Sequence, residues 1–331
     1  MNIMNWIWFR LGKRHWNKRD LERALYYMRK GERAITDMSD HMIYAELLHN
    51  DGHSEEALTY LGQVARTAPD HRVHERRAYI LRELGRDHDA IEDLNEAIRL
   101  NDDHYLTWFT RGITHKDLQQ YDKAIADLKE SMRREQQDTV ISTYYELGMA
   151  YYESGNPKEA VIYFSKSVEL PDRAIPIYYY MLAACLDLLD RLPDAVRALQ
   201  AGIRLLTRYQ EEEDGGYALF ARSTNYSYEA FLIFQQQVRD SCDFRRVLAD
   251  LYFRLGQYHD AERSIEEGLA RFPDAHELYL KRAELRHHSG HKEEAKADLK
   301  QAIERSPDDY RAYFELARIY RRMVWRRTPS N

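Results

Sequence analysis

The stretch ISTYYELGMAYYESGNPKEAVIYFSKSVELPDRAI, Ile141–Ile175, decides the fold of this chain. Its first half carries apolar residues at helical spacing, and the turn-forming residues Ser-Gly-Asn-Pro at 154–157 separate it from a second helical half. Small residues at Gly148 and Ala160 let the two helix backbones approach closely, while aromatic side chains fill the space beside them. The stretch therefore predicts two short helices joined by a turn.

The same pattern, a small residue followed twelve positions later by Ala, recurs along the chain. Successive copies are 33 to 36 residues apart, except for one gap of 66 that a weaker pair, Ala218 and Ala230, divides. The clear copies are Gly12/Ala24, Ala45/Ala57, Ala78/Ala90, Gly112/Ala124, Gly148/Ala160, Ala183/Ala195, Ala249/Ala261 and Ala283/Ala295. Their agreement in spacing indicates a repeat protein built from one helix pair.

The repeating pair resembles the tetratricopeptide repeat, a helix–turn–helix unit of about 34 residues. The resemblance implies an all-α, right-handed superhelical solenoid in which each repeat contacts its neighbours. The segment 211–241 opens with the poor helix sequence EEEDGG, and is either a degenerate repeat or a helical insertion. We expect one array over 1–331, with repeats at 5–37, 38–70, 71–104, 105–140, 141–175, 176–210, 211–241 (degenerate), 242–275 and 276–309, and a capping helix at 310–325.

Composition and charge exclude several classes of protein. The net charge is −6, but residues 1–36 carry nine Lys/Arg against three Asp/Glu, so the body between the basic ends is strongly acidic. An acidic body argues against nucleic-acid binding, which needs a basic contact surface. Cys185 and Cys242 form no disulfide framework, and no apolar run is long enough to cross a bilayer. We therefore expect a cytoplasmic protein without an integral membrane segment.

In the family that this chain resembles, ligands bind on the concave face, which the first helix of each pair lines. The aromatic and apolar character of the central positions and the arginines near the C-terminus imply a protein or peptide partner with apolar and acidic residues. Alternatively, a tight superhelix buries these side chains on its own inner wall. The matching positions are Tyr79, Phe109, Ile113, Tyr145, Met149, Tyr152, Tyr180, Arg246, Phe253, Arg254, Phe314, Arg318 and Arg322, with Asp250, Leu280, Glu284 and Arg311 beside them.

Catalytic and cofactor motifs do not emerge from the sequence. There is no nucleophile elbow, phosphate loop or HExxH motif, so we expect a non-catalytic scaffold without a cofactor. The cluster of His287, His288 and His291 lacks a Cys or paired carboxylate to complete a metal shell, so no metal site is predicted.

Two other functions remain open. Some bacterial repeat proteins of this kind are phosphatase-type or peptide-sensing regulators, although a first copy near residue 5 leaves no room for an N-terminal effector domain. The N-terminal helix combines Trp6, Ile7, Trp8 and Phe9 with basic residues. It either packs on the second repeat or recruits the protein to a membrane surface as an adaptor.

Overall fold

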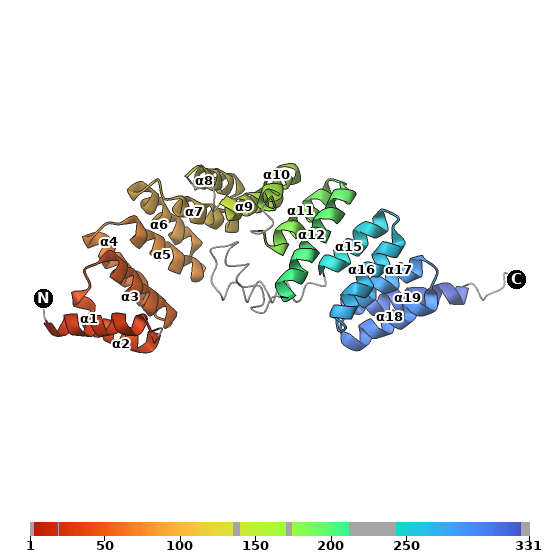
Figure 1. Ribbon diagram of the computed structural model, residues 1–331, viewed down its shortest axis with the longest axis horizontal. Coiled ribbons are helices and arrows are strands. Elements are labelled where there is room, and N and C mark those ends of the chain that lie inside the picture. Colours follow the sequence, from red (N-terminus) through yellow and green to blue (C-terminus); the bar gives the residue numbers. More distant parts are fainter. Residues whose placement is uncertain (1–2, 19, 135–139, 170–173, 212–242, 326–331) are drawn as a thin grey trace. The chain divides into compact units, whose positions relative to one another are not determined.

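The computed structural model describes residues 3–18, 20–134, 140–169, 174–211 and 243–325, and every regular element in these ranges is a helix (Figure 1). By its internal contacts the chain forms two compact units, Met1–Ala150 and Tyr151–Asn331. The prediction of a degenerate repeat or an insertion at 211–241 falls outside the described residues, apart from the final residue of one helix.

The first unit consists of consecutive helix pairs, in which the first helix packs on the second and the second contacts the next pair (Figure 1). Its helices are α1 (Ile3–Trp16), α2 (Leu21–Gly31), the 3-10 turn η1 (Glu32–Ala34), α3 (Met38–Asn50), α4 (Ser54–Thr67), α5 (His71–Glu83), α6 (Asp87–Leu100), α7 (Tyr105–Asp117), α8 (Tyr121–Arg134) and most of α9 (Val140–Glu153).

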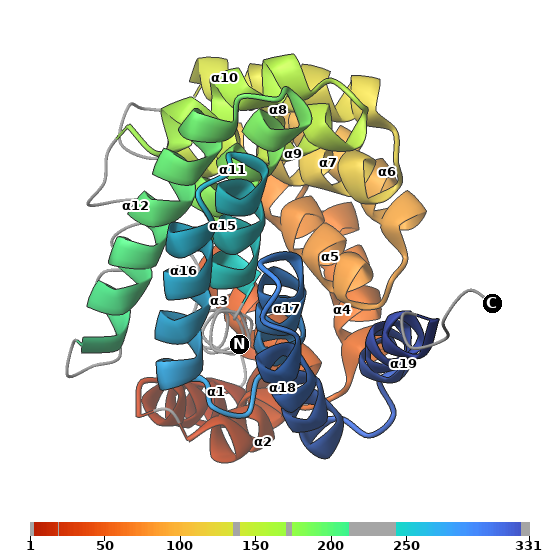
Figure 2. The same ribbon diagram turned by 90° about the vertical axis from the view of Figure 1, so that its right-hand side faces the viewer.

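The second unit repeats this arrangement and ends on a single helix. Figure 2 shows α15 beside α16 and α17 beside α18, and α18 packs on α19. The bounds of α19 coincide with the capping helix predicted at 310–325. The helices of this unit after α9 are α10 (Pro157–Ser167), α11 (Pro176–Leu188), α12 (Leu192–Glu211), α15 (Asp243–Arg254), α16 (Tyr258–Arg271), α17 (His276–His288), α18 (Lys292–Arg305) and α19 (Tyr310–Trp325).

The sixteen anchor residues of the eight clear copies are all buried. Gly12 shows why they must be small: a Cβ at this position would lie 2.5 Å from Met28 Cγ and 3.1 Å from the carbonyl oxygen of Ala24. A larger residue would push α1 away from α2 and overpack the pair. The fold class, an all-α solenoid of stacked helix–turn–helix repeats, is therefore confirmed.

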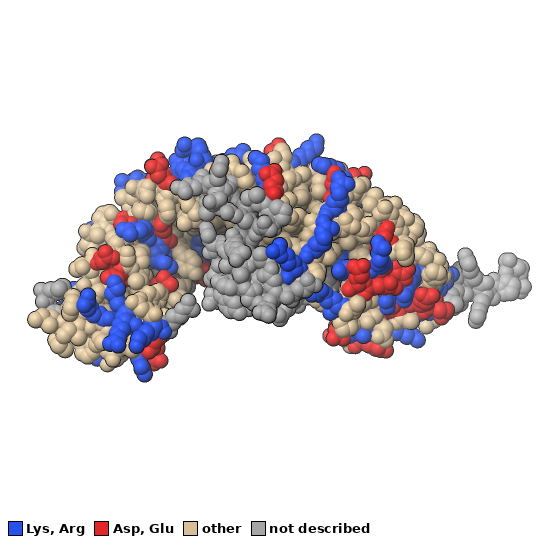
Figure 3. All heavy atoms as spheres, viewed as in Figure 1, with Lys and Arg blue, Asp and Glu red and all other residues tan. Residues whose placement is uncertain are grey.

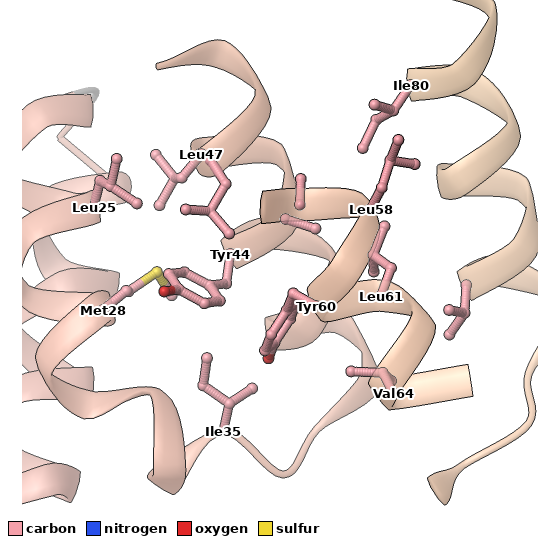
Figure 4. Close-up of a cluster of buried hydrophobic side chains, with 14 of the residues drawn as sticks. Leu25, Met28, Ile35, Tyr44, Leu47, Leu58, Tyr60, Leu61, Val64 and Ile80 are labelled. Carbon is pink, nitrogen blue, oxygen red and sulfur yellow. The ribbon is translucent and has the colours of Figure 1, made fainter. Parts of the chain in front are cut away.

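Aromatic and branched side chains fill the space within the pairs and between them. In the first unit, Tyr44 of α3 meets Tyr60 of α4 edge to face, with ring centroids 4.9 Å apart. Leu25 and Met28 of α2 lie on one side of these rings (Figure 4). A narrow core of this kind is shared by neighbouring repeats, so each pair depends on the next for its burial.

The length and hydropathy of the described helices decide whether any of them could span a membrane. Among them, none has both the length and the hydropathy that a bilayer span requires. Lys and Arg gather over the α1–α2 pair in Figure 3, as the basic sequence of residues 1–36 predicts.

Candidate functional site

A groove of about 570 Å³ lies on the second unit, along the first helices of its last two pairs and the helix that follows them. The helices that line it are α15 and α17, each the first helix of its pair, and α19. Its lining consists of Arg246, Asp250, Glu277, Leu280, Lys281, Glu284, Tyr310, Arg311, Phe314, Glu315 and Arg318.

The repeat register explains why these side chains share one surface. The anchors Ala249 and Ala283 face the second helix of their pairs and are buried, so the neighbouring turns of α15 and α17 present their other residues to the groove. On α19, Tyr310, Phe314 and Arg318 are spaced four residues apart and lie on one face. The exposed fraction is 78% for Tyr310 and 66% for Phe314, so the wall formed by α19 is an open aromatic surface.

A buried lysine forms the floor of the groove. The side chain of Lys281 is only 9% exposed and forms ion pairs with Asp250 of α15 and with Glu284, the latter at 2.8 Å. Burial alone would lower the pKa of Lys281, but the hydrogen bonds to Asp250 and Glu284 outweigh it and raise the pKa above its ordinary value. Lys281 therefore remains charged and is held in place by its two partners.

The three arginines of the groove also pair within the chain. Arg246 Nη2 lies 3.0 Å from Asp243 Oδ1, within the same helix. Arg311 donates two hydrogen bonds to Asp309, from Nε to Oδ1 at 2.9 Å and from Nη2 to Oδ2 at 2.6 Å. These bonds hold the pKa of Asp309 below its ordinary value.

Arg318 forms an exposed ion pair within its own helix. Its Nη2 lies 2.7 Å from Glu315 Oε2, but the two side chains are 43% and 34% exposed. Exposed pairs of this kind contribute about 0–1 kcal/mol, because water screens them and two long side chains must be ordered. A carboxylate brought by a ligand can therefore take the place of Glu315 at Arg318 with little loss.

The structure brings together only some of the C-terminal residues that the sequence assigned to the binding surface. Arg246, Phe314 and Arg318 line the groove. Phe253 is half-buried and packs against Tyr258 and His288.

The remaining two arginines of that set differ from the groove residues. Arg254 forms an ion pair with Asp187 of α11, and its Nη2 lies 3.5 Å from Asp190 Oδ1. It therefore joins α15 to the preceding pair. Arg322 belongs to α19, and its side chain lies outside the described residues.

The central residues are mostly half-buried. In the second unit, Tyr152 is half-buried, and the ring of Tyr180 lies 5.0 Å from that of Phe244, between centroids. Burial raises the pKa of the Tyr180 hydroxyl. This tyrosine is thus partly used for packing α11 against α15, as the inner-wall alternative anticipated.

In the first unit the predicted residues lie on three first helices. Tyr79 of α5 is exposed, and its ring stands edge-on to His49 with centroids 5.9 Å apart. The other four are half-buried: they are Phe109 and Ile113 on α7 and Tyr145 and Met149 on α9.

Sequence reasoning missed four residues of the groove, Glu277, Lys281, Tyr310 and Glu315. Two of them stand one helical turn before residues that it did identify: Glu277 precedes Leu280, and Tyr310 precedes Phe314. Extending each first-helix stripe by one turn would have found Tyr310. Lys281 gave no such signal, because a lysine on a helix is normally exposed.

Comparisons with known proteins agree with this architecture. Sequence models described as tetratricopeptide repeat match residues 45–105, 105–138, 141–170, 243–285 and 276–309, which together make up more than half of the chain. No curated protein sequence matches the chain.

Solved structures that are similar to this chain have little sequence in common with it. The C-terminal part of a repeat-containing protein from Cytophaga hutchinsonii is 18% identical with a TM-score of 0.56, the match covering 83% of this chain and 99% of that one. A tetratricopeptide repeat protein from Parabacteroides merdae is 16% identical with a TM-score of 0.49, covering 96% and 100%.

A third similar structure is longer than this chain. In the Cut9–Hcn1 hetero-tetramer of APC/C, the matched chain is 16% identical with a TM-score of 0.48. The match covers 90% of this chain but only 52% of that one, so this chain spans about half of its length. With its buried anchors, its stacked helix pairs and its family matches, the chain belongs to the tetratricopeptide repeat family, whose members are generally non-catalytic protein-interaction scaffolds.

Proposed function

We propose that this protein is a non-catalytic scaffold that binds a segment of a partner protein in the groove of α15, α17 and α19. The observation that carries the proposal is the pair of exposed aromatic side chains, Tyr310 and Phe314, one turn apart above a polar groove. Large apolar side chains left in contact with water beside a concave surface are typical of binding sites. Aromatic residues and arginine are also the residue types that contribute most to binding energy at interfaces.

The chemistry of the lining indicates which segment would fit. An apolar side chain of the partner would pack between Phe314 and Leu280, removing both from water. A carboxylate near this side chain in the bound segment would bind Arg318, because the present ion pair of Arg318 with Glu315 is exposed and weak. Lys281 adds little net charge to the groove, because two carboxylates already neutralise its ammonium group, and it acts mainly as part of the groove surface. The preferred ligand is therefore a short segment with an apolar residue and an acidic residue close together.

The proposal can be tested by selection from a displayed library of random peptides on the intact protein. Peptides retained by the wild type are counter-selected on a variant that carries Phe314→Ala and Arg318→Glu. We expect an enriched set that combines an aromatic or branched apolar residue with Asp or Glu, and that the variant does not retain. Equal retention by the variant, or no enrichment on the wild type, would contradict the proposal.

A second candidate function rests on α1. Ile3, Met4, Trp6 and Ile7 are exposed on this helix, and the guanidinium of Arg10 lies 4.6 Å from the centroid of the Trp6 ring. An exposed apolar stripe next to basic residues is suited to the interface of an anionic membrane. The opposite side of α1 packs on α2, with Trp8 stacked on Tyr27 at 5.6 Å.

Removing the whole helix would therefore damage the first pair, because Phe9 and Gly12 are buried. The sharper test is flotation with anionic vesicles of the wild type and of a variant with Ile3→Glu and Ile7→Glu, which changes exposed positions only. Membrane recruitment predicts that the wild type floats and the variant does not. Equal behaviour of the two proteins would exclude this surface as the anchor.

A further inference from the structure

Two histidines and a glutamate from two repeats come together in the first unit. His71 is the first residue of α5, Glu75 stands one turn later on the same helix, and His104 directly precedes α7. Each residue offers one possible metal-ligand atom, and these atoms all lie within 4.8 Å of one another. This cluster could not be recognised in the sequence, because 29 residues separate Glu75 from His104.

Glu75 is held at the centre of the cluster. Its Oε1 lies 2.5 Å from Nδ1 of His104, and it also accepts a hydrogen bond from the hydroxyl of the buried Thr107. The carboxylate therefore faces the two imidazoles and is kept there by a second residue that is not itself a ligand. Support of this kind is typical of the residues around a metal centre, because it orients the ligands.

His71 is held less firmly than Glu75. Its Nδ1 lies 3.5 Å from Asp70 Oδ1 and its Nε2 lies 3.5 Å from Asn101 Nδ2, both at the long limit for a hydrogen bond. Its ring stands edge-on to that of His104, with centroids 5.3 Å apart. A carboxylate beside Nδ1 is the arrangement that leaves Nε2 of a histidine to bind a metal.

We propose that His71, Glu75 and His104 bind a divalent transition-metal cation of the zinc type. Two imidazoles and one carboxylate are a preferred ligand set for Zn²⁺, with metal–ligand distances of about 2.0–2.2 Å. Two ligands of one ion are then at most about 4.4 Å apart, so atoms that all lie within 4.8 Å of one another are near the separations that a shared ion requires, and the 2.5 Å hydrogen bond between Glu75 and His104 must open to admit the ion. Rotation of the half-buried imidazoles supplies this movement. Three protein ligands leave a position for water or for a group of a partner.

Local charge sets the strength expected of the site. The amino-terminal ends of α5 and α7 carry partial positive charge, which opposes a cation. The carboxylates of Glu75 and Asp70 offset this effect, although Arg72 already pairs with Asp70 at 2.7 Å. We therefore expect a dissociation constant in the micromolar range, about 1–10 μM, rather than the much tighter binding of a four-ligand structural zinc site. The site lies in the first unit and is independent of the proposed peptide groove.

The test is titration of the full chain with Zn²⁺ by calorimetry, together with Co²⁺ absorption to report the coordination number. The variants are Glu75→Gln, which keeps the shape of the side chain, and His104→Ala. The control is His53→Ala, which removes a more exposed histidine beside a single carboxylate, Asp51. Circular dichroism establishes that each variant is folded.

We expect one equivalent of Zn²⁺ in the micromolar range for the wild type and the His53 variant, and binding at least tenfold weaker in both site variants. The Co²⁺ complex of the wild type should show the intense visible bands of four- or five-fold coordination, and Glu75→Gln should remove them. Equal zinc affinity in wild type and Glu75→Gln, or no micromolar binding at all, would overturn the proposal. The cluster would then be a hydrogen-bonded clasp between α5 and α7.

Discussion

Arg111 of α7 and Asp127 of α8 form a two-bond ion pair across their helix pair, with Nε–Oδ2 and Nη2–Oδ1 distances both 2.7 Å. An ion pair joins the same two positions in two other repeats, as a single contact of 3.1 Å between Arg77 and Asp93 and as a pair with several hydrogen bonds, the shortest 2.7 Å, between Arg282 and Asp298. In each case the arginine directly precedes the first anchor, and the aspartate stands three residues after the second. A bidentate pair at this place fixes how far each second helix is rotated against the first.

The Arg111–Asp127 pair predicts a clear loss of stability when one partner is removed. Asp127→Ala would leave a largely buried guanidinium without its carboxylate, at a cost of about 3 kcal/mol. Urea denaturation followed by circular dichroism measures this change. Asp122→Ala, which removes an exposed carboxylate from the same helix, should cost less than about 1 kcal/mol. Equal losses in the two variants would show that the buried pair is not a stabilising feature.

The turns between paired helices yield a second prediction. Gly85 and Gln119 occupy equivalent turn positions and both have positive φ, 70° and 59°. A Cβ at Gly85 would meet nothing within 4 Å, so Gly85→Ala tests backbone strain alone and should cost about 1 kcal/mol. Gln119→Gly should increase the free energy of unfolding by about 0.5 kcal/mol, because relief of strain exceeds the added freedom of the unfolded chain.

Gly62 supplies the matched control for this pair. It lies inside α4 without a positive φ, and a Cβ there also meets nothing within 4 Å. Gly62→Ala should therefore stabilise the protein by roughly 0.5–1 kcal/mol, the opposite sign to Gly85→Ala. Thermal unfolding of the three variants in parallel checks both signs. The same sign for Gly62→Ala and Gly85→Ala would refute the strain argument.

Asp309 at the start of α19 makes stability depend on pH. Its hydrogen bonds from Arg311 lower its folded-state pKa, so its charged form stabilises the folded protein above the unfolded-state pKa of about 3.9. That contribution is lost as the pH falls below about 4 and through the folded-state pKa. Asp309→Asn keeps an oxygen for the backbone N–H of Arg311 but removes the charge. The variant should be less stable than wild type by roughly 1 kcal/mol at pH 7, and the difference should vanish in acid. A constant difference from pH 7 to pH 2 would contradict this assignment.

Cys185 offers a probe for opening of the second unit. Its side chain is fully buried in α11, and burial raises the pKa of its thiol to about 12. Because the thiolate is the reactive species, we expect Cys185 to react with a thiol reagent only when the helix pair opens. In a Cys242→Ser variant, labelling in buffer should be at least a hundredfold slower than in denaturant. Rapid labelling of the native protein would show that the core around α11 is open.

Much of the fold could be predicted because the repeat obeys a local rule. Where two helix backbones approach closely, only Gly or Ala fits, and Gly12 and Ala24 illustrate the contact directly. A rule that involves residues twelve apart can be recognised in one sequence. It predicted helix pairs whose anchors the structure buries, and a helix, α19, spans the residues at 310–325 where a capping helix was expected.

The details of the binding surfaces could not be predicted in this way. Arg254 forms an ion pair with Asp187, 67 residues earlier in the chain. His104 forms a hydrogen bond with Glu75, 29 residues earlier. Such contacts depend on how one repeat is placed against the next, and the twelve-residue rule says nothing about that placement. The sequence therefore predicted some residues on the groove-lining helices but not the ion pairs that decide which of their charges a ligand can reach.

The central claim, that the groove of α15, α17 and α19 binds a partner segment, is tested most directly by a binding titration. One peptide from the selection is labelled and titrated by fluorescence anisotropy with wild type, Phe314→Ala, Arg318→Glu and Tyr313→Ala. Tyr313 is an exposed aromatic residue of the same helix outside the groove lining, which makes it the matched control. We predict that Phe314→Ala and Arg318→Glu each weaken binding at least tenfold, about 1.4 kcal/mol, and that Tyr313→Ala leaves it unchanged. Equal affinities across all four proteins would place the binding surface elsewhere and contradict the account.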